Sequence, residues 1–535
     1  MNKYIILALL FVGCFSYSCK DTYDEHYKNE DRSLSDKTLM ELIVENDQLS
    51  VFSKLIEIAA YDTLLSSNQT FTVWAPLNES LSDIQLESIS KEDAQQIVSN
   101  HVARFNNSTV TPDTRMIRMR ANKTYSFSRG GAYFGESKIA EGDILAKNGI
   151  LHTIETRIPY YYNIYEYILS NPNTSKLADF FRSLEEEIFN EELSVPIDLN
   201  ENGQTVYDTV TTFYNRLFDA KYSFGMIDLG LGQIYQEDSL YTMLVPTNDA
   251  WDAAYARISP YFQSIGGQTY VDSLRNLQTS LAILEDLIYR GRIENPTSND
   301  LVSTSPSYIY NTVELFSGTE KIQASNGLIF QANDLRYDNT QTWHKWINVE
   351  SDEAQGRVLS ANTQITTRTV EGDLGVAVSG SSYLYVVGST PSAQPGVTFE
   401  IPNVLSGRYD IYVDFIPLYL DPLGNEGEKT KFQFELAHID LDGKEVKKHI
   451  NSADLVSSDI LRTELKIFSD YQFPVSNYYD RLWEGDYLDG LYTIEDRKFT
   501  TKLLVRTNVS NTELNSGAYA RKFCIDRIIF VPVHE

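Results

Sequence analysis

The amino-acid sequence predicts a multidomain protein with two α+β domains followed by an all-β antiparallel sandwich. Two segments occur twice in the same order: TVWAPLNESL (72–81) returns as TMLVPTNDAW (242–251), and NGILHTIE (148–155) returns as NGLIFQAN (326–333). Repetition in a fixed order indicates a duplicated α+β domain. The sandwich is predicted by short alternating runs without helical periodicity after about residue 338, among them SSYLYVVG and KLLVRTNV.

Amphipathic helices precede each copy of the first repeated segment. Apolar residues recur at helical spacing within 42–59 and again within 164–181, as expected of helices that bury one face. We expect each copy to continue into a strand that ends at the proline and then into a helix capped by Asn78 or Asn248. Acidic residues follow both asparagines and favour the first turn of a helix. Capping is therefore favoured over a catalytic role for these residues.

The order of these segments resembles that of fasciclin-like domains, whose hallmark strands read T-V-F-A-P-T-N-x-A-F and N-G-x-I-H-x-I-D. The segments TVWAPLNESL, NHVARF and NGILHTIE match that order, and the resemblance covers about residues 35–335. The first copy retains His152 of the second hallmark, where the second copy has Phe330. The resemblance implies a pair of compact α+β domains.

Animal members of this family use an aromatic-His pair near the middle of the domain in adhesion. We take the matching positions here to be Asn100-His101 in the first copy and Tyr289-Arg290 in the second. Neither pair is intact, so the resemblance does not carry the receptor-binding role over to this chain.

The C-terminal third contains VTFEIPNVLSGRYDIYVDF and ends with IDRIIFVPV. These runs resemble galactose-binding-like jelly rolls, the fold of many carbohydrate-binding modules. The predicted division of the chain is a signal peptide at 1–19, a flexible tether at 20–35, fasciclin-like domains at 36–159 and 160–337, and a sandwich at 338–535.

The N-terminus has a basic start at Lys3 and an apolar run that is too short to span a bilayer, as in a secretory signal. Ser18 directly before Cys19 resembles a bacterial lipoprotein cleavage site, with Cys19 as the lipidated residue. Cys14 is a competing choice, and an ordinary cleaved signal is the alternative. The polar stretch KDTYDEHYKNEDRS resembles the tether of surface-exported Bacteroidota lipoproteins, so we expect a lipid anchor in the outer membrane that faces the cell exterior.

The composition and motifs argue against several functional classes. A formal net charge of −29 and a pI near 4.6 oppose nucleic acid as a partner, because it requires a basic surface. No His-Glu-x-x-His, Gly-x-Ser-x-Gly, phosphate-loop or dinucleotide motif occurs. We therefore expect no enzyme activity and no cofactor, and we expect Cys524 to be a buried, inert thiol.

One segment resembles the opening of a calcium loop. Its candidate ligands are Asp198, Asn200, Asn202 and Asp208, but the twelfth position, which should be acidic, is Thr209. The favoured alternative is an Asn-Gly hairpin between two alternating strands.

Aromatic residues next to polar ones are the candidate ligand-binding groups, because sugars present apolar C–H faces to aromatic rings. The candidates are Trp343 and Trp346 in TWHKW, and Tyr478, Tyr479, Trp483 and Tyr487 in NYYDRLWEGDYLDGLY. The alternative is that Trp343 and Trp346 pin a domain junction and that Trp483 packs on the sandwich.

Together these features predict a non-catalytic cell-surface lipoprotein that binds ligand, with glycan as the leading class. Such a protein would work beside a Sus-like outer-membrane importer. The alternative is a cell-surface lipoprotein for adhesion or protein interaction.

Overall fold

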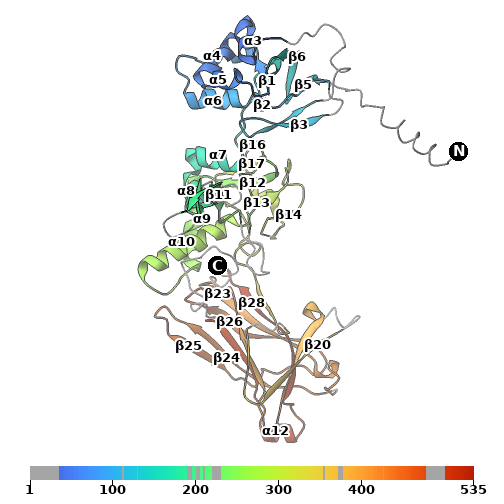
Figure 1. Ribbon diagram of the computed structural model, residues 1–535. Helices are drawn as coiled ribbons and strands as arrows, with labels where there is room; N and C mark the ends of the chain where they lie inside the picture. The colour runs from blue at the N-terminus through green and yellow to red at the C-terminus, as the bar shows by residue number, and fades with distance from the viewer. Residues whose placement is uncertain are drawn as a thin grey trace, which may run out of the picture. The chain divides into compact units, whose positions relative to one another are not determined.

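The computed structural model describes residues 35–110, 114–128, 131–189, 195–199, 205–208, 211–219, 230–305, 307–352, 356–370, 378–425, 427–477 and 500–534. The chain divides into two units between Tyr162 and Asn163 (Figure 1). Within the described ranges, no helix has the length and apolar character needed to cross a membrane.

The first unit places its helices on one side of a sheet (Figure 1). The α3 helix starts at a capping box in which Thr38 and Glu41 satisfy each other's backbone N–H groups. Its apolar positions Leu39, Met40 and Ile43 are buried. The helices are α3 (Leu39–Glu45), α4 (Ser50–Ile58), α5 (Asp62–Leu65) and α6 (Lys91–Ser99), with short 3-10 turns η1 (Asp47–Leu49) and η2 (Asn78–Leu81).

The sheet of the first unit has the order β2-β1-β7-β6-β5-β4-β3. Its strands are β1 (Phe71–Pro76), β2 (Val102–Arg104), β3 (Arg115–Arg118), β4 (Thr124–Phe127), β5 (Tyr133–Phe134), β6 (Ser137–Ala146) and β7 (Gly149–Ile154). The two hallmark segments form the parallel pair β1 and β7, with Phe71 opposite Gly149. Every residue of both strands is buried, as expected of strands covered on both faces.

The N-terminal part of the second unit repeats this arrangement. Its central sheet has the order β13-β12-β17-β16, and β12 runs parallel to β17 with Tyr241 opposite Gly327. The strands are β12 (Tyr241–Pro246), β13 (Ile288–Arg290), β16 (Glu320–Ala324) and β17 (Gly327–Ala332). The helices are α7 (Ile164–Ser170), α8 (Ser175–Arg182), α9 (Asn248–Ile258), α10 (Gln268–Leu284) and α11 (Thr312–Leu315), with 3-10 turns η4 (Pro172–Thr174) and η5 (Ser259–Tyr261).

We call β1, β2, β6 and β7 with α3 to α6 the first copy, and β12, β13, β16 and β17 with α7 to α10 the second copy. Three two-stranded sheets accompany the second copy. They pair β8 (Glu185–Phe189) with β11 (Thr211–Asn215), β9 (Val195–Leu199) with β10 (Thr205–Asp208), and β14 (Leu301–Val302) with β15 (Tyr308–Ile309).

The remainder of the second unit is the predicted antiparallel all-β part. One sheet has the order β20-β21-β28-β23-β26, with β18 also paired to β28, and the other has the order β19-β22-β27-β24-β25. Apolar side chains of both sheets meet in a single core, for example Phe399 and Phe434 from one sheet with Ile411 and Phe530 from the other. The elements are β18 (Ile347–Glu350), β19 (Arg357–Leu359), β20 (Thr363–Thr369), β21 (Ser382–Gly388), β22 (Gly396–Glu400), β23 (Arg408–Ile416), β24 (Phe432–Ile439), β25 (Glu445–Ile450), β26 (Thr463–Gln472), β27 (Lys502–Thr507), α12 (Asn511–Asn515) and β28 (Lys522–Pro532).

Candidate functional site

The repeated asparagines Asn78 and Asn248 are structural, but they do not cap the helices that follow them. Asn78 Oδ1 accepts the N–H of Val51 at 2.9 Å, near the start of α4, and Asn248 Oδ1 accepts the N–H of Lys176 at 3.0 Å, near the start of α8. The cap of α9 is Thr247, whose hydroxyl accepts the N–H of Ala250. Both asparagines therefore bind the N-terminus of a helix, as predicted, but each binds an earlier helix rather than the one that follows it.

The asparagines that open the second repeated segment, Asn148 and Asn326, also have a structural role. Asn148 accepts the N–H of Leu39 and donates to two carbonyl groups. Asn326 does the same with the N–H of Ile164. Each asparagine thus ties a strand to the first residue of a helix, which satisfies a backbone N–H that the helix leaves unpaired.

The two histidines of the first copy are buried and hydrogen-bonded. His101 Nδ1 donates to the carbonyl of Ile97 at 2.7 Å, and its Nε2 accepts the N–H of Ile158 at 3.0 Å. Burial lowers the pKa of His101 to about 4. His152 accepts the N–H of Asp143. These contacts make both rings structural.

The position equivalent to His101 in the second copy is Leu287. The N–H of Trp74 donates to the carbonyl of His101, and the N–H of Leu244 donates to the carbonyl of Leu287, both at 2.9 Å. The match of Asn100-His101 with Tyr289-Arg290 was therefore wrong, because strand register rather than local residue type sets the equivalence. His152 and Phe330 are equivalent as expected, since they lie opposite Trp74 and Leu244.

Two of the calcium candidates, Asp198 and Asp208, lie on paired antiparallel strands. Asp198 lies opposite Val206, and Asp208 lies opposite Val195 in the antiparallel pair of β9 and β10, so the ladder separates the two aspartates. Asn200 and Asn202 lie outside the described residues. In the part of the chain that the structure describes, no group of three or more His, Cys, Asp or Glu side chains could hold a metal ion.

The two tryptophans of TWHKW have opposite environments. Trp343 is 3% exposed and packs against Tyr261 with ring centroids 5.0 Å apart, whereas Trp346 is 57% exposed. Trp343 therefore belongs to the core and Trp346 to the surface. The other aromatic candidates, Tyr478, Tyr479, Trp483 and Tyr487, lie outside the described residues, as do Cys19 and nearly all of the predicted tether.

Two further exposed rings lie on the hairpin of β14 and β15. Tyr308 is 60% exposed and Tyr310 is 61% exposed, and their ring centroids are 6.4 Å apart with planes inclined by 15°. Lys345, the neighbour of Trp346, reaches this hairpin through a 2.5 Å hydrogen bond to Ser307. Sequence reasoning missed this pair, although the alternation Tyr-Ile-Tyr places both rings on one face of a strand.

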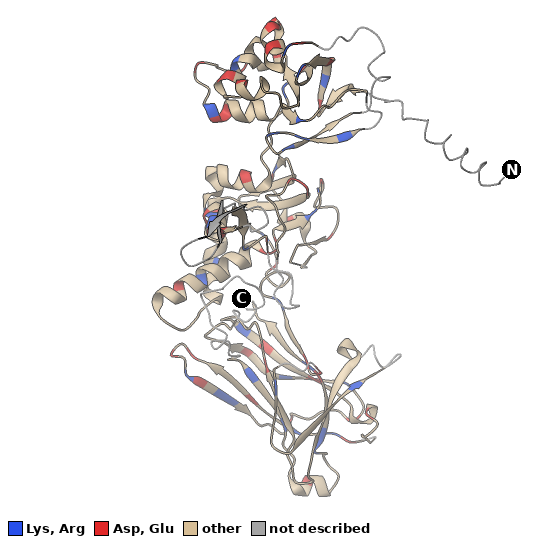
Figure 2. Cartoon of the chain, viewed as in Figure 1, with Lys and Arg blue, Asp and Glu red and all other residues tan. Residues whose placement is uncertain are grey.

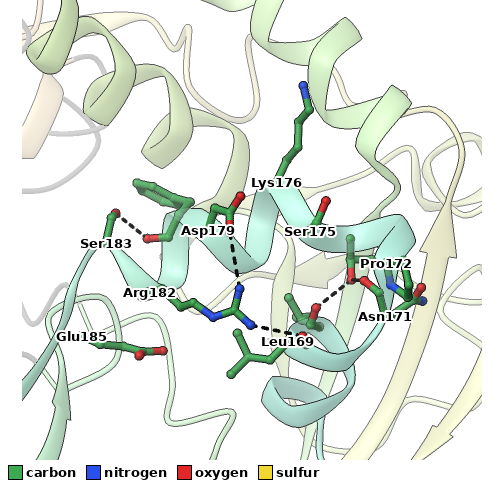
Figure 3. Close-up of polar contacts among 12 residues, drawn as sticks. Leu169, Asn171, Pro172, Ser175, Lys176, Asp179, Arg182, Ser183 and Glu185 are labelled. Carbon is green, nitrogen blue, oxygen red and sulfur yellow. Dashed lines mark hydrogen bonds and ion pairs between the residues drawn. The ribbon is translucent and has the colours of Figure 1, made fainter.

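A groove of about 440 Å³ lies between α8, α9 and α10. Its aromatic lining comes from Phe180, Trp251 and Tyr255. Figure 3 shows the α8 side of this region, where Asp179 pairs with Arg182 at 3.4 Å. The remaining lining residues are polar: Lys176, Asp179, Ser183, Asp252, Asn276 and Ser280.

A second cavity, of about 460 Å³, lies beside α12 in the sandwich. Tyr519 lines it together with Glu428 and Lys522, which form an ion pair at 2.7 Å. Because this pair already neutralises both charges, these two groups have less electrostatic attraction left for a ligand than an unpaired charge would have.

Charged residues of both signs are interspersed over the ribbon of both units (Figure 2). Cys524 is a buried free thiol in β28, as predicted, and burial raises its pKa above the ordinary value. A thiol held in its neutral form is a poor nucleophile.

Comparison with known proteins places a Fasciclin domain at residues 47–159. Among solved structures, the FAS1 domain pair of the insect cell adhesion molecule Fasciclin I is similar, with 14% identity, a TM-score of 0.20, and coverage of 56% of this chain and 99% of that chain. No curated protein matches.

Two xylan-related modules are also similar in structure. The C-terminal family 22 carbohydrate-binding module of Clostridium thermocellum Xyn10B has 14% identity and a TM-score of 0.20, covering 34% of this chain and 91% of the module. The CBM22-1 xylan-binding domain of Paenibacillus barcinonensis Xyn10C has 13% identity and a TM-score of 0.21, covering 35% and 94%. These values are too low to carry an argument about ligands.

Proposed function

We propose that this chain is a non-catalytic cell-surface lipoprotein that binds glycan, anchored in the outer membrane through Cys19. The observation that carries the proposal is the exposure of Trp346, Tyr308 and Tyr310 within one unit. Folding normally buries most of the surface of such large rings, so exposed ones indicate a contact surface. A pyranose presents C–H groups that pack on an aromatic face while its hydroxyls bond to neighbouring polar groups.

Polar groups accompany these rings. Gln341 accepts the N–H of Tyr310 at 3.0 Å, and Lys345 donates to Ser307. These contacts hold the segment before Trp346 beside the hairpin that carries both tyrosines. The proposed organisation is a pair of fasciclin-like domains that space and dock the protein, a sandwich at 338–535, and a Sus-like importer as the partner.

The test is glycan binding by the full chain, measured on a glycan array and then by calorimetry. Trp346→Ala is expected to weaken binding at least tenfold, and Tyr308→Ala with Tyr310→Ala severalfold each, since covering the apolar surface of a large side chain contributes about 1.5–3 kcal/mol when burial is complete. Tyr133→Ala in the first unit is the matched control, because Tyr133 is also exposed. A chain that binds no glycan at all contradicts the proposal.

The membrane anchor is tested separately. Metabolic labelling with a fatty acid in the native host should label the wild-type chain and leave Cys19→Ala unlabelled. Label that persists in the variant assigns the anchor to another residue.

The second candidate function is adhesion through protein contacts. It is favoured by the apolar side chains Val302 and Val313, which are exposed on and near the same hairpin. Capture of a defined surface protein that Trp346→Ala abolishes and free sugar does not affect would select this function over glycan binding.

A further inference from the structure

The groove between α8, α9 and α10 has the chemistry of a sugar site, and we propose that it binds one neutral sugar residue of a glycan. This inference rests on the proposed function and places a second, distinct contact in the second copy. The groove volume of about 440 Å³ falls within the range of small-ligand pockets.

Aromatic rings form the walls of the groove. Phe180 and Trp251 lie with ring centroids 6.0 Å apart at 40°, and Tyr255 follows Trp251 by about one turn of α9. Phe180 and Trp251 are only 7% and 6% exposed, so the partly buried Tyr255 offers the largest aromatic surface to a sugar.

The groove also contains hydrogen-bonding groups that the protein itself leaves unused. Among the described residues, no hydrogen bond is made by the Ser280 hydroxyl, the Trp251 indole N–H, the Tyr255 hydroxyl or the Asn276 amide. Ser280 is only 2% exposed, yet its hydroxyl is not sealed from solvent. A hydroxyl that reaches the groove and makes no bond within the protein can donate to or accept from a ligand there. These four groups match the donors and acceptors of a sugar.

The charges around the groove favour a neutral ligand. Lys176 is the one cation in the lining and pairs with Asp252 at 2.6 Å, while Asp179 adds a second carboxylate. Asp179 is in turn paired with Arg182 just outside the lining. Among the described lining residues no unpaired cation is therefore left to hold a uronic acid or a sulfated sugar, which favours a neutral ligand.

The first copy has smaller and entirely apolar side chains at the equivalent positions. Counting along the helices from the shared hydrogen bonds of Asn78 and Asn248, and of His101 and Leu287, gives the equivalences. The groove residues Phe180, Trp251 and Ser280 correspond to Leu55, Leu81 and Ala94. The latter three are fully buried in one apolar core.

Calorimetry of the full chain tests the inference, with cellohexaose, xylohexaose, mannohexaose and maltohexaose as neutral probes and trigalacturonate as the anionic probe. Tyr255→Ala is expected to weaken the binding of the best neutral probe at least tenfold. Ser280→Val replaces the hydroxyl by a methyl group and is expected to weaken that binding about fivefold or more. Asn295→Ala, an exposed asparagine in a loop outside the groove, is the matched control and should bind as wild type. Thermal melting verifies that each variant folds.

The possible outcomes distinguish a sugar site in the groove from the proposed function of the whole chain. Neutral-probe binding that falls with Tyr255→Ala and Ser280→Val supports the groove. Binding that both variants leave intact while Trp346→Ala abolishes it overturns the groove and keeps the proposed function. If trigalacturonate binds more tightly than every neutral probe, with the same dependence on Tyr255, the proposal that the ligand is a neutral sugar is wrong. A wild-type chain that binds no sugar overturns the proposed function itself.

Discussion

The two copies share a scaffold and differ in what their helices enclose. Both hold parallel central strands in the same register, and both use an asparagine to bind the start of an earlier helix. In the first copy Leu55, Leu81 and Ala94 close the space between the helices. In the second copy Phe180, Trp251 and Ser280 occupy these positions and line a groove.

The two copies show which residues the shared scaffold requires and which residues can vary. The strand ends and the asparagines are the same in both copies because backbone groups there need partners. The residues between the helices vary because different side-chain sets can satisfy the same backbone. New binding surfaces in a duplicated domain are therefore expected at the positions between the helices, where the residues can vary.

The largest expected effect concerns the shared glycines. A Cβ at Gly149 would lie 1.9 Å from the carbonyl oxygen of Phe71, and one at Gly327 would lie 1.7 Å from that of Tyr241. Both glycines also have positive φ, +155° and +146°. Gly149→Ala and Gly327→Ala should each cost more than about 3 kcal/mol of stability in urea unfolding.

Gly318→Ala is the control for these variants, because Gly318 has positive φ but open space around its Cβ position. It should cost only about 1 kcal/mol. Calorimetry should show Gly149→Ala lowering a transition that Gly327→Ala leaves unchanged. Equal effects of both variants on every transition would mean that the units unfold together.

The next effect is a pH dependence confined to the first copy. The pKa of His101 is lowered to about 4 by burial, so the unfolded chain takes up the proton first as the pH falls. The stability of the first unit should therefore drop by about 3 kcal/mol between pH 7 and pH 4 from this group. Leu287 cannot titrate at the equivalent position.

His101→Gln removes the titrating ring and keeps a donor and an acceptor. Urea unfolding at pH 7 and pH 4.5 should then show a smaller loss for the first unit than in wild type. An unchanged pH dependence in the variant would assign the effect to other groups.

A smaller and equal effect is expected from the two asparagines. Asn78→Ala and Asn248→Ala each remove a helix cap and two donated hydrogen bonds. Each should cost about 1–2 kcal/mol in denaturant unfolding. The exposed Asn68→Ala should be within ~0.5 kcal/mol of wild type. If the two substitutions lower the free energy of unfolding by amounts that differ more than twofold, the two copies do not depend equally on their asparagines.

The smallest expected effect is that of Ser280→Ala, which is compared with Ala94→Ser at the equivalent position of the first copy. Ala94→Ser places a hydroxyl in a closed apolar core and should cost about 1–3 kcal/mol. Ser280→Ala removes an unbonded hydroxyl from the groove and should change stability by less than ~0.5 kcal/mol. Matched thermal melts check the pair, and a large loss in Ser280→Ala would reveal a partner for that hydroxyl.

Much of the fold follows from local sequence. The alternating runs predicted the antiparallel strands, because side chains in a strand alternate between two faces. The repeated segments predicted that one arrangement occurs twice. The partner of Asn78 was harder to predict, since the N–H group that it accepts lies 27 residues earlier in the chain, and for Asn248 the separation is 72 residues. Local sequence carries no sign of such a partner.

The ligand surfaces could be predicted only in part. Trp343 and Trp346 lie three residues apart in one segment, yet one is buried and the other exposed, because Trp343 packs against Tyr261. The groove combines residues from three helices, and neither Phe180 nor Ser280 is distinctive by itself. Their position opposite Trp251 is a property of packing.

The central parallel pair also has a consequence for synthesis of the protein on the ribosome. Phe71 in β1 faces Gly149 in β7, so nearly all of the first unit must emerge before its sheet can close. Until then β1 and the start of α3 lack the strand and the Asn148 side chain that complete them. Contacts so distant along the chain form slowly, and the first unit is expected to remain open to chaperones during that interval.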